Sequence, residues 1–419
     1  MQLGLSRSSS EHTTPRQNVP RGDLTAPRAC STILRCFAGP EADELAILCR
    51  PESPSADAVL QAEAAYRSLS ALLDAHGASY RDLASETLFL RDIRRDLPAV
   101  LAVRARILAD IGRSAGALPP TFIQQAPLDE DEAFELAASA VVPRHRDTWS
   151  VRDVAATPPC VCEGCGQSAA RLIRIGGQTS LHTTNLYGVG GDAFEQASSM
   201  FRETERLLDR CGMGFRDVVR AWIYLRDIDR DYDALNRARR EFFLRHRIEP
   251  RPASTGVQGV PFPDAHDFSI RLHAIRSSRP LDIGPMSTPT LNEAWSYGAD
   301  FSRGLRIADA NKVSLYVSGT ASIDEAGRTV HVGDFEAQVD RMLHNIASLL
   351  AQQGATFADL VSGVTYLKNR SDTPVLRSLL RQRGLDDFPL ALLEAPLCRP
   401  DLLCETEVVA LLPVATAEA

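Results

Sequence analysis

Two glutamates near the C-terminus, Glu405 and Glu407, stand two residues apart in the apolar segment CETEVVALL. Side chains of a strand alternate between its two faces, so this spacing predicts that both carboxylates lie on one face. A neighbouring like charge or an apolar environment raises the pKa of a carboxyl group toward neutrality. Such a group can donate or accept a proton at working pH, which makes Glu405 and Glu407 the candidate catalytic residues. The alternative is a structural carboxylate paired with an arginine or with backbone amides.

Two arginines could hold the substrate of such an acid. A guanidinium grips a carboxylate through two parallel hydrogen bonds, so it suits a small carboxylated substrate. Arg399 stands six residues before Glu405, and Arg303 lies in the segment FSRG. A surface ion pair is the alternative role for each arginine. Tyr297 could donate its hydroxyl to the same ligand, or it could pack as a core aromatic.

Ser318, Gly319 and Thr320 end an apolar segment that we expect to be a strand. Backbone amides at such a strand end can stabilise an oxyanion, so these residues are further candidates for substrate binding. A strand that ends in glycine is also typical of an ordinary turn.

Three cysteines form a cluster in PPCVCEGCGQ, at Cys160, Cys162 and Cys165. Their spacing could supply three thiolate ligands to zinc, with His182 as a possible fourth ligand. The alternative is a loop with free thiols, and we expect no metal or other cofactor from the rest of the sequence.

The composition is that of a globular protein of two or three domains: 419 residues, 44% hydrophobic and 24% charged. The net charge of -8 argues against a nucleic-acid partner, which would normally meet a basic surface. No apolar run approaches the roughly 20 residues of a membrane-spanning helix. Nine cysteines, an odd number, suit a reducing cytoplasm better than a disulfide framework.

One spacing pattern occurs three times along the chain. A glutamine, a glycine, an aspartate and a leucine follow one another at steps of 16, 5 and 8 residues. The three copies are Gln61, Gly77, Asp82 and Leu90; Gln196, Gly212, Asp217 and Leu225; and Gln338, Gly354, Asp359 and Leu367.

Each copy predicts the same elements around these residues. An amphipathic helix runs from the glutamine to the glycine, and a strand, a second helix and a closing strand follow. The predicted fold class is α+β, with three tandem units that each pair a mixed sheet with two helices on one face. In the second copy the closing strand IRLHAI suggests that Arg271 and His273 replace the two glutamates. The first copy shows no obvious closing strand.

These patterns divide the chain into five segments. We expect a disordered tail over 1–32, a degenerate unit over 33–113 and an irregular linker with the cysteine cluster over 114–170. The second unit then spans 171–280, and the third and best preserved unit spans 281–419.

The third unit resembles the Rid/YjgF family of small trimeric proteins. The likeness lies in YVSGTASIDEAGRTVHVGDFEAQVDRMLHNIASLLAQQGATFADLVSGVTYLKN and in CETEVVAL. The second unit is similar to a diverged copy, and the first to a more diverged one. The resemblance implies ligand clefts between neighbouring units, and three units in one chain suggest a covalent pseudo-trimer.

Residues from about 180 to 412 are also similar to the chorismatase branch of this superfamily. The similar segments are YGADFSRG, SGTASI, DYDALNRARREFF and PASTG. Those enzymes hydrolyse the enol ether of chorismate. The resemblance implies that Glu405 faces the ligand and that Arg303 matches an arginine of the family. The arginine with which Rid enzymes hold a substrate carboxylate is replaced here by Ala391, and by Ser254 in the second unit.

We therefore expect an enzyme that acts on a small carboxylated metabolite, by hydrolysis or elimination at an imine, enamine or enol ether, with Glu405 as the acid or base. Chorismatase-type cleavage of chorismate, to pyruvate and a cyclohexadiene or hydroxybenzoate, is one form of this hypothesis, and imine deamination is another. A non-catalytic metabolite-binding or scaffold protein is the alternative class. We expect either a monomeric pseudo-trimer or a homo-oligomer, with no nucleic-acid or membrane partner.

Overall fold

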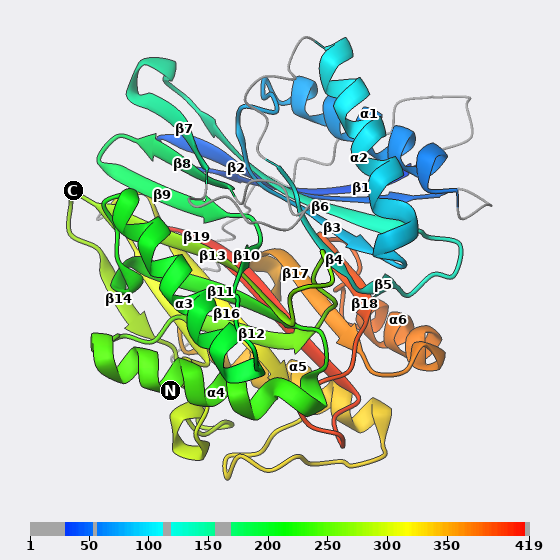
Figure 1. The fold of residues 1–419 in the computed structure, drawn as a ribbon, viewed down its shortest axis with the longest axis vertical. Coiled ribbons are helices and arrows are strands. Elements are labelled where there is room, and N and C mark those ends of the chain that lie inside the picture. The colour runs from blue at the N-terminus through cyan, green and yellow to red at the C-terminus, as the bar shows by residue number, and fades with distance from the viewer. Residues whose placement is uncertain (1–29, 53–56, 112–118, 156–168, 415–419) are drawn as a thin grey trace, which may run out of the picture.

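The computed structural model describes residues 30–52, 57–111, 119–155 and 169–414. Most of the expected N-terminal tail lies outside these ranges, and so do Cys160, Cys162 and Cys165. The described chain forms three mixed sheets, each accompanied by a pair of helices (Figure 1). The predicted α+β architecture of three tandem units is confirmed.

The first unit consists, in chain order, of β1 (Cys30–Ala38), β2 (Ala42–Pro51), α1 (Ala58–Ala75), β3 (Leu83–Leu90), α2 (Ile93–Asp110), β4 (Thr121–Gln124) and β6 (Phe134–Pro143). Its strands lie in the order β1-β2-β6-β3-β4. The first unit therefore does have a closing strand, β6, which lies within the segment expected to be an irregular linker. Its sequence FELAASAVVP places three alanines and one serine before its two valines, so most of it lacks the β-branched signal of a typical strand.

The second unit consists of β7 (Trp149–Ala155), β8 (Ala169–Ile175), β9 (Gln178–Thr183), β10 (Leu186–Tyr187), α3 (Ala193–Arg210), β11 (Val218–Leu225), α4 (Ile228–His246), β12 (Ala253–Gln258) and β13 (Phe268–Ser277). Its strands lie in the order β12-β11-β13-β9-β8-β7, and β10 pairs with β13. Strand β7 also comes from the expected linker, and so does β5 of the third sheet, so that segment contributes to all three sheets.

The third unit consists of β14 (Asp282–Pro285), β15 (Gly304–Ala308), β16 (Lys312–Ala321), α5 (Phe335–Ala351), β17 (Leu360–Leu367), α6 (Thr373–Gln382), β18 (Leu390–Glu394) and β19 (Cys404–Pro413). Its strands lie in the order β14-β15-β16-β19-β17-β18-β5. The last strand, β5 (Ala126–Pro127), comes from the first unit, so the first and third units share a sheet.

The recurring glutamine has the same function in all three units. Each glutamine lies in the first turn of a helix that begins after an aspartate N-cap, and its side chain reaches the start of the closing strand. Its side-chain oxygen accepts the backbone amide of the residue just before that strand: Ala133 for Gln61, Asp267 for Gln196 and Leu403 for Gln338. The recurring glycine adopts a positive φ at each helix end, as a left-handed C-cap requires.

The pairing of strands fixes which residues are equivalent in the three closing strands. The recurring leucines pair with Phe134, Phe268 and Cys404. The residue directly after the paired one is Glu135, Ser269 or Glu405 in the three strands. The residue three positions after the paired one is Ala137, Arg271 or Glu407. The expected alignment of Arg271 and His273 with the two glutamates is therefore wrong by two residues. A two-residue slip preserves the alternation of faces, so the sequence pattern alone does not detect it.

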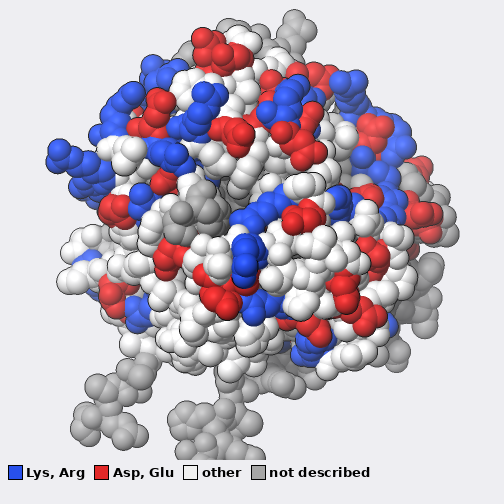
Figure 2. All heavy atoms as spheres, turned by 90° about the horizontal axis from the view of Figure 1, so that it is seen from below, with Lys and Arg blue, Asp and Glu red and all other residues white. Residues whose placement is uncertain are grey.

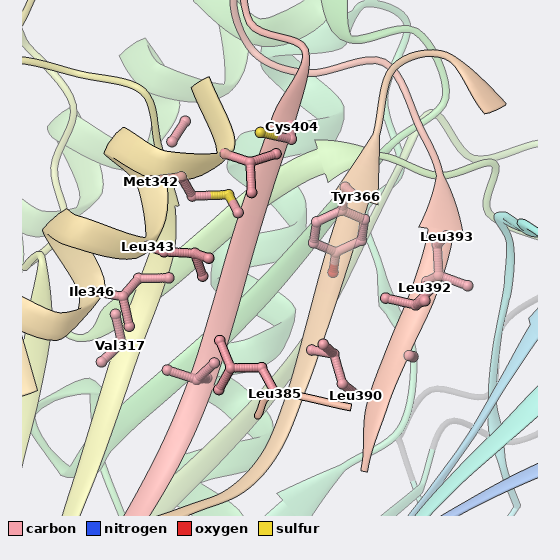
Figure 3. Packing of buried hydrophobic residues seen from close by; sticks show 14 of the residues in the cluster. Val317, Met342, Leu343, Ile346, Tyr366, Leu385, Leu390, Leu392, Leu393 and Cys404 are labelled. Carbon is pink, nitrogen blue, oxygen red and sulfur yellow. The ribbon is translucent and has the colours of Figure 1, made fainter. Parts of the chain in front are cut away.

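The apolar side of α5 packs on the sheet of the third unit, as its periodicity predicts. Met342, Leu343 and Ile346 point toward β16 and β19, where they meet Val317 and the region of Cys404 (Figure 3). All five side chains are buried. Full burial of an aliphatic side chain contributes about 1.5–3 kcal/mol, so this packing holds the start of β19 in place.

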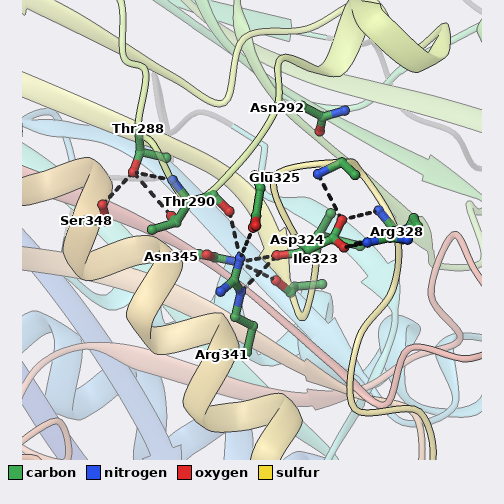
Figure 4. A network of polar contacts seen from close by, with 12 residues as sticks. Thr288, Thr290, Asn292, Ile323, Asp324, Glu325, Arg328, Arg341, Asn345 and Ser348 are labelled. Carbon is green, nitrogen blue, oxygen red and sulfur yellow. Dashed lines mark hydrogen bonds and ion pairs between the residues drawn. The ribbon is translucent and has the colours of Figure 1, made fainter.

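The segment between β14 and β15 is fastened to α5 and to the turn after β16 by polar contacts (Figure 4). The Arg341 guanidinium donates to the carbonyl oxygens of Thr290 at 2.9 Å and Ile323 at 3.0 Å. The Asn345 side chain donates to the Ile323 carbonyl at 3.0 Å. These bonds fix the segment that leads from Asn292 to Arg303.

Candidate active site

A cavity of about 590 Å³ lies between the second and third units. Residues of α4 and β12 line it on one side, and residues of β16, β19 and the 298–303 segment line it on the other. The charged residues that line it are Asp233, Arg237, Arg239, Arg240, Arg303, Arg399 and Glu405. One of the five guanidinium groups, that of Arg240, pairs with Asp300 at 3.3 Å. The other four still outnumber the two carboxylates of the lining, which makes this cleft attractive to an anion.

Glu405 reaches this cleft from the second position of β19, where it pairs with Ala321 and Tyr366 in the backbone register. Only 5% of its surface is exposed. Burial raises the pKa of its carboxyl group to about 7, and the charge of Glu407 adds to the effect. Within the described residues no group donates a hydrogen bond to this carboxylate, so it is available to a ligand.

Gly319 forms the floor beneath this carboxylate. A side chain at position 319 would overlap the Glu405 carboxylate, so the close approach requires glycine. The Gly319 amide donates to the Thr255 hydroxyl at 3.0 Å, which fixes the strand of one unit against the other. The site therefore depends on the contact between the second and third units.

Both arginines predicted from the sequence lie in the cleft with Glu405. Arg303 is buried and donates to the Asn292 carbonyl at 2.8 Å and to the Asn292 side-chain oxygen at 3.1 Å. Arg399 donates to the Gly327 carbonyl at 2.8 Å. These bonds orient the two guanidinium groups, and both groups lower the pKa of Glu405 against the effect of burial.

Helix α4 supplies a polar wall that was not predicted as part of the site. Its residues Tyr232, Asn236, Arg239 and Arg240 line the cleft at helical spacing. The Asn236 side-chain oxygen accepts a hydrogen bond from Arg239 at 2.7 Å. The segment DYDALNRARREFF was quoted above for its resemblance alone. Its polar face could have been recognised from this i, i+4, i+7, i+8 spacing.

Glu407 does not line the cleft, although it lies on the same side of β19 as Glu405. Arg220 donates to it at 2.6 Å, and the Trp222 indole donates to its other oxygen at 2.6 Å. Both members of the Arg220–Glu407 pair are buried. This geometry is that of the structural alternative for Glu407, and the charge of Glu407 raises the pKa of Glu405.

Ser318 and Thr320 also serve the framework. The Ser318 hydroxyl donates to the Ser302 carbonyl at 2.6 Å and accepts the Ser254 amide at 2.8 Å. The Thr320 hydroxyl donates to the Ser318 carbonyl at 2.9 Å. The Ser318 amide donates to the Arg303 carbonyl, and the Gly319 amide is bound by Thr255. The expected oxyanion role of the Ser318 and Gly319 amides is therefore wrong, since both donors are already used.

Tyr297 and the cysteine cluster, both predicted as candidates, lie wholly or partly outside the described residues. Tyr297 belongs to the short helical turn Ala294–Tyr297, but its side chain is outside the described residues, while Gly298 beside it lines the cleft. The three clustered cysteines are also outside them, and the described part of the chain contains no group of ligands suited to a metal ion. His182, their suggested partner, instead stacks on His273.

Cys398 lines the cleft close to Glu405. Burial, and then the charge of Glu405, raise the pKa of its thiol to about 12. The thiol therefore stays protonated at neutral pH and is a poor nucleophile.

A family model described as Endoribonuclease L-PSP matches residues 166–275 and 296–412, which is just over half of the chain. The chain belongs to this family. The two matches fall on the second and third units, and they confirm the predicted Rid/YjgF relationship of tandem units.

Curated relatives share part of this sequence. A 3-hydroxybenzoate synthase of Streptomyces hygroscopicus is 31% identical over 223 residues, which are 47% of this chain and 64% of that protein. A chorismatase of Streptomyces rapamycinicus is 28% identical over 227 residues, 47% of this chain and 65% of that protein. The chain thus spans just under two thirds of the length of both. A 3-aminoacrylate deaminase of Acinetobacter baylyi is 30% identical over 97 residues, 23% of this chain and 77% of that protein.

A solved structure shares the fold. The crystal structure of a chorismatase superposes with a TM-score of 0.56 at 18% identity, and the match covers 79% of this chain and 93% of that chain.

On the face that Figure 2 shows, lysines and arginines lie among aspartates and glutamates and form no continuous basic band. Among the described residues, no helix is both long and apolar enough to cross a membrane.

Proposed function

We propose that the cleft binds a small carboxylated metabolite and that Glu405 transfers a proton to it. The observation that carries this proposal is a carboxyl group with a pKa of about 7 facing a cleft lined by five arginines. Half-protonated near neutral pH, Glu405 can act both as an acid and, after giving up its proton, as a base.

The substrate class that fits best is an enol ether bearing carboxylates, of which chorismate is the example suggested by the names of the relatives. Chorismate carries a carboxylate on its ring and another on its enolpyruvyl group. Arg303 and Arg399 approach Glu405 from different segments of the third unit, and the arginines of α4 face them from the second unit. Such a cleft can bind two separate carboxylates while the ether lies beside Glu405.

The reaction follows from these positions. Glu405 gives its proton to the methylene carbon of the enol ether, which leaves an oxocarbenium ion. Water adds to that cation and returns one proton to the Glu405 carboxylate. The hemiketal then loses its hydroxyl proton, the bond from the former enol-ether carbon to the ring oxygen breaks, and that ring oxygen takes up a proton. Pyruvate and a hydroxylated cyclohexadiene are released, so that substrate and water balance the products. The arginines hold the carboxylates throughout.

Imine or enamine deamination is the competing reaction, because the third unit resembles the aminoacrylate deaminase. The two places at which the Rid arginine is expected hold Ser254, which lines this cleft, and Ala391, which is buried on β18. Neither side chain can bind a carboxylate as a guanidinium does. This departure favours the enol ether over the imine.

The test is incubation of the purified chain with chorismate, with pyruvate measured enzymatically and the ring product identified by mass spectrometry. We expect pyruvate release, and we expect Glu405→Gln to abolish it while chorismate still binds. Glu336→Gln, at an exposed position in the first turn of α5, is the matched control and should leave turnover unchanged.

Three other outcomes would change the proposal. Binding of chorismate without turnover by the wild-type chain would favour the non-catalytic class. Turnover of 3-aminoacrylate but not of chorismate would favour the deaminase. Pyruvate release that survives Glu405→Gln would exclude Glu405 as the acid.

A further inference from the structure

The three sheets enclose a second cavity, of about 270 Å³, which is lined by residues of all three units. The Arg220–Glu407 pair lies in the wall that separates this central cavity from the cleft. Both residues line the central cavity, while Thr255, whose hydroxyl accepts a hydrogen bond from Arg220 at 2.6 Å, lines the cleft. The central cavity is therefore a separate space, and the proposed reaction does not use it.

Arg271 brings an unbalanced positive charge to this cavity. Its guanidinium donates to the Thr87 hydroxyl at 2.7 Å and lies 3.9 Å from the centre of the Trp222 ring, and both groups are neutral. Its Nε atom is buried without an acceptor. Among the described residues no carboxylate lies within ion-pair distance of it. A partly buried guanidinium without a counter-charge is costly, so this arrangement favours an anion as the occupant.

The other charged groups that line the cavity have partners of their own. The Asp309 carboxylate accepts the backbone amides of Asn311 and Lys312, and Glu41 lies 3.4 Å from Arg279. Lys312 pairs with Glu44, and Arg220 pairs with Glu407. Burial lowers the pKa of His273 to about 3, and burial together with the charges nearby keeps the pKa of His182 well below its usual range. Both imidazoles are therefore neutral, and Arg271 is the cationic group of this cavity that has no carboxylate partner among the described residues. A single negative charge on the ligand suffices.

The walls beside Arg271 are flat and largely apolar. The His182 and His273 rings stack with centroids 4.1 Å apart, and the Tyr316 hydroxyl lies 3.2 Å from His273 Nδ1. His273 Nε2 is buried without a partner. Phe89 and Val409 add apolar surface. A ligand with a flat apolar body and one acidic group would satisfy both kinds of surface.

We propose that the central cavity is a second binding site, for a small monocarboxylate with an aromatic body that pairs with Arg271. This site goes beyond the proposed function, because it lies on the other side of the Arg220–Glu407 wall and needs no part of the cleft.

Benzoate is the probe for the first experiment, with binding measured by calorimetry and by the shift in melting temperature. We expect benzoate to bind the wild-type chain, and to bind Arg399→Gln, in which the cleft is altered, with unchanged affinity. Arg271→Met should weaken benzoate at least about tenfold, since the charge-assisted bonds are lost. Arg276→Met is the matched control, because Arg276 lies on the same strand but is exposed.

The melting temperature without ligand distinguishes this proposal from a structural role for Arg271. Removal of an uncompensated, partly buried charge should leave the melting temperature unchanged or raise it, whereas removal of a structural arginine should lower it. Retention of full benzoate affinity in Arg271→Met would overturn the proposal. Equal displacement of benzoate by chloride or phosphate would overturn the aromatic carboxylate and leave only an inorganic anion.

A crystal structure with 4-bromobenzoate provides a measurement that does not depend on the folding of a variant. An anomalous bromine peak between Arg271 and the stacked imidazoles would support the site. A peak only in the cleft, beside Glu405, would overturn it without affecting the proposed reaction. Chorismate turnover and benzoate binding are thus measured separately, so either proposal can fail alone.

Discussion

Glu405 and Glu135 occupy the same place in two of the three sheets, each one residue into the closing strand, opposite Tyr366 and Phe89 respectively. Their surroundings differ. Arg50 donates to Glu135 at 2.9 Å and also reaches the Leu390 carbonyl of the third unit. Glu405 instead faces an open cleft. Equivalent glutamates of two units therefore have different surroundings: Glu135 forms an ion pair, and Glu405 is the candidate acid.

The pH dependence of turnover should show the pKa of Glu405. The proposed reaction needs the protonated carboxyl group, so kcat should be high below pH 7 and fall as the pH rises through about 7. Pyruvate release measured from pH 5 to pH 9 at saturating chorismate tests this. A profile that rises with pH across the same range would mean that the ionised carboxylate is the active form.

The stability of the chain should respond to the same proton. Because the pKa of Glu405 is raised from 4.5 to about 7 on folding, its contribution to stability is full below pH 4.5 and is lost as the pH rises through about 7. The loss at pH 8 is about 3 kcal/mol. Glu405→Gln should therefore be more stable than the wild type at pH 8 and close to it at pH 5, as measured by denaturant unfolding. Equal differences at both pH values would contradict the raised pKa.

Glu407→Gln should chiefly destabilise the chain. It leaves the buried Arg220 guanidinium without its counter-charge, which typically costs about 3–5 kcal/mol. It also removes a negative charge that raises the pKa of Glu405, so the fall in kcat should move to lower pH. Thermal unfolding and the pH profile test both effects. A loss of turnover at every pH, with unchanged stability, would indicate that Glu407 takes part in the chemistry.

Gly319→Ala should reduce turnover at least about tenfold, because the new methyl group displaces the Glu405 carboxylate from its position. Gly284→Ala is the matched control in the same sheet, since a methyl group there meets no atom within 4 Å. Both variants are compared in the chorismate assay and by their melting temperatures. Similar activities for the two variants would mean that the position of Glu405 tolerates displacement.

The mass in solution tests the covalent pseudo-trimer. If three units in one chain replace three subunits, light scattering should give a mass near 45.7 kDa. A mass about twice or three times larger would show that the chain associates further. In that case the homo-oligomer alternative would hold, and the interface would become the next question.

Local patterns in the sequence predicted the repeating framework well. The stripe around Met342 and Ile346 and the spacing from Gln338 to Leu367 reflect contacts within one helix and one sheet. Glu405, Arg303 and Arg399 were found because they belong to the third unit, whose pattern is the best preserved. Each of these signals arises from residues close together in the chain.

Contacts between units could not be predicted in the same way. The partner of Glu407 is Arg220, which lies 187 residues away and on another sheet. From the sequence alone, the arginines of α4 are typical of a solvated helix surface, and only the position of the third unit makes them part of a cleft. The sequence likewise suggests Ser318 as a ligand-binding residue, whereas in the structure its hydroxyl connects the Ser302 carbonyl and the Ser254 amide. Which residues form each site depends on how the units are placed against one another. The spacing of residues along the chain carries no information about that placement.

Equivalent positions in the three closing strands hold Ala137, Arg271 and Glu407. In a ring of three identical subunits, any residue at this position would appear three times around the axis, so three like charges or three neutral side chains would face one another. Fusion of the units into one chain removes that symmetry constraint. A neutral, a positive and a negative side chain can then surround one small space, and each unit can mutate without imposing the same change on its neighbours.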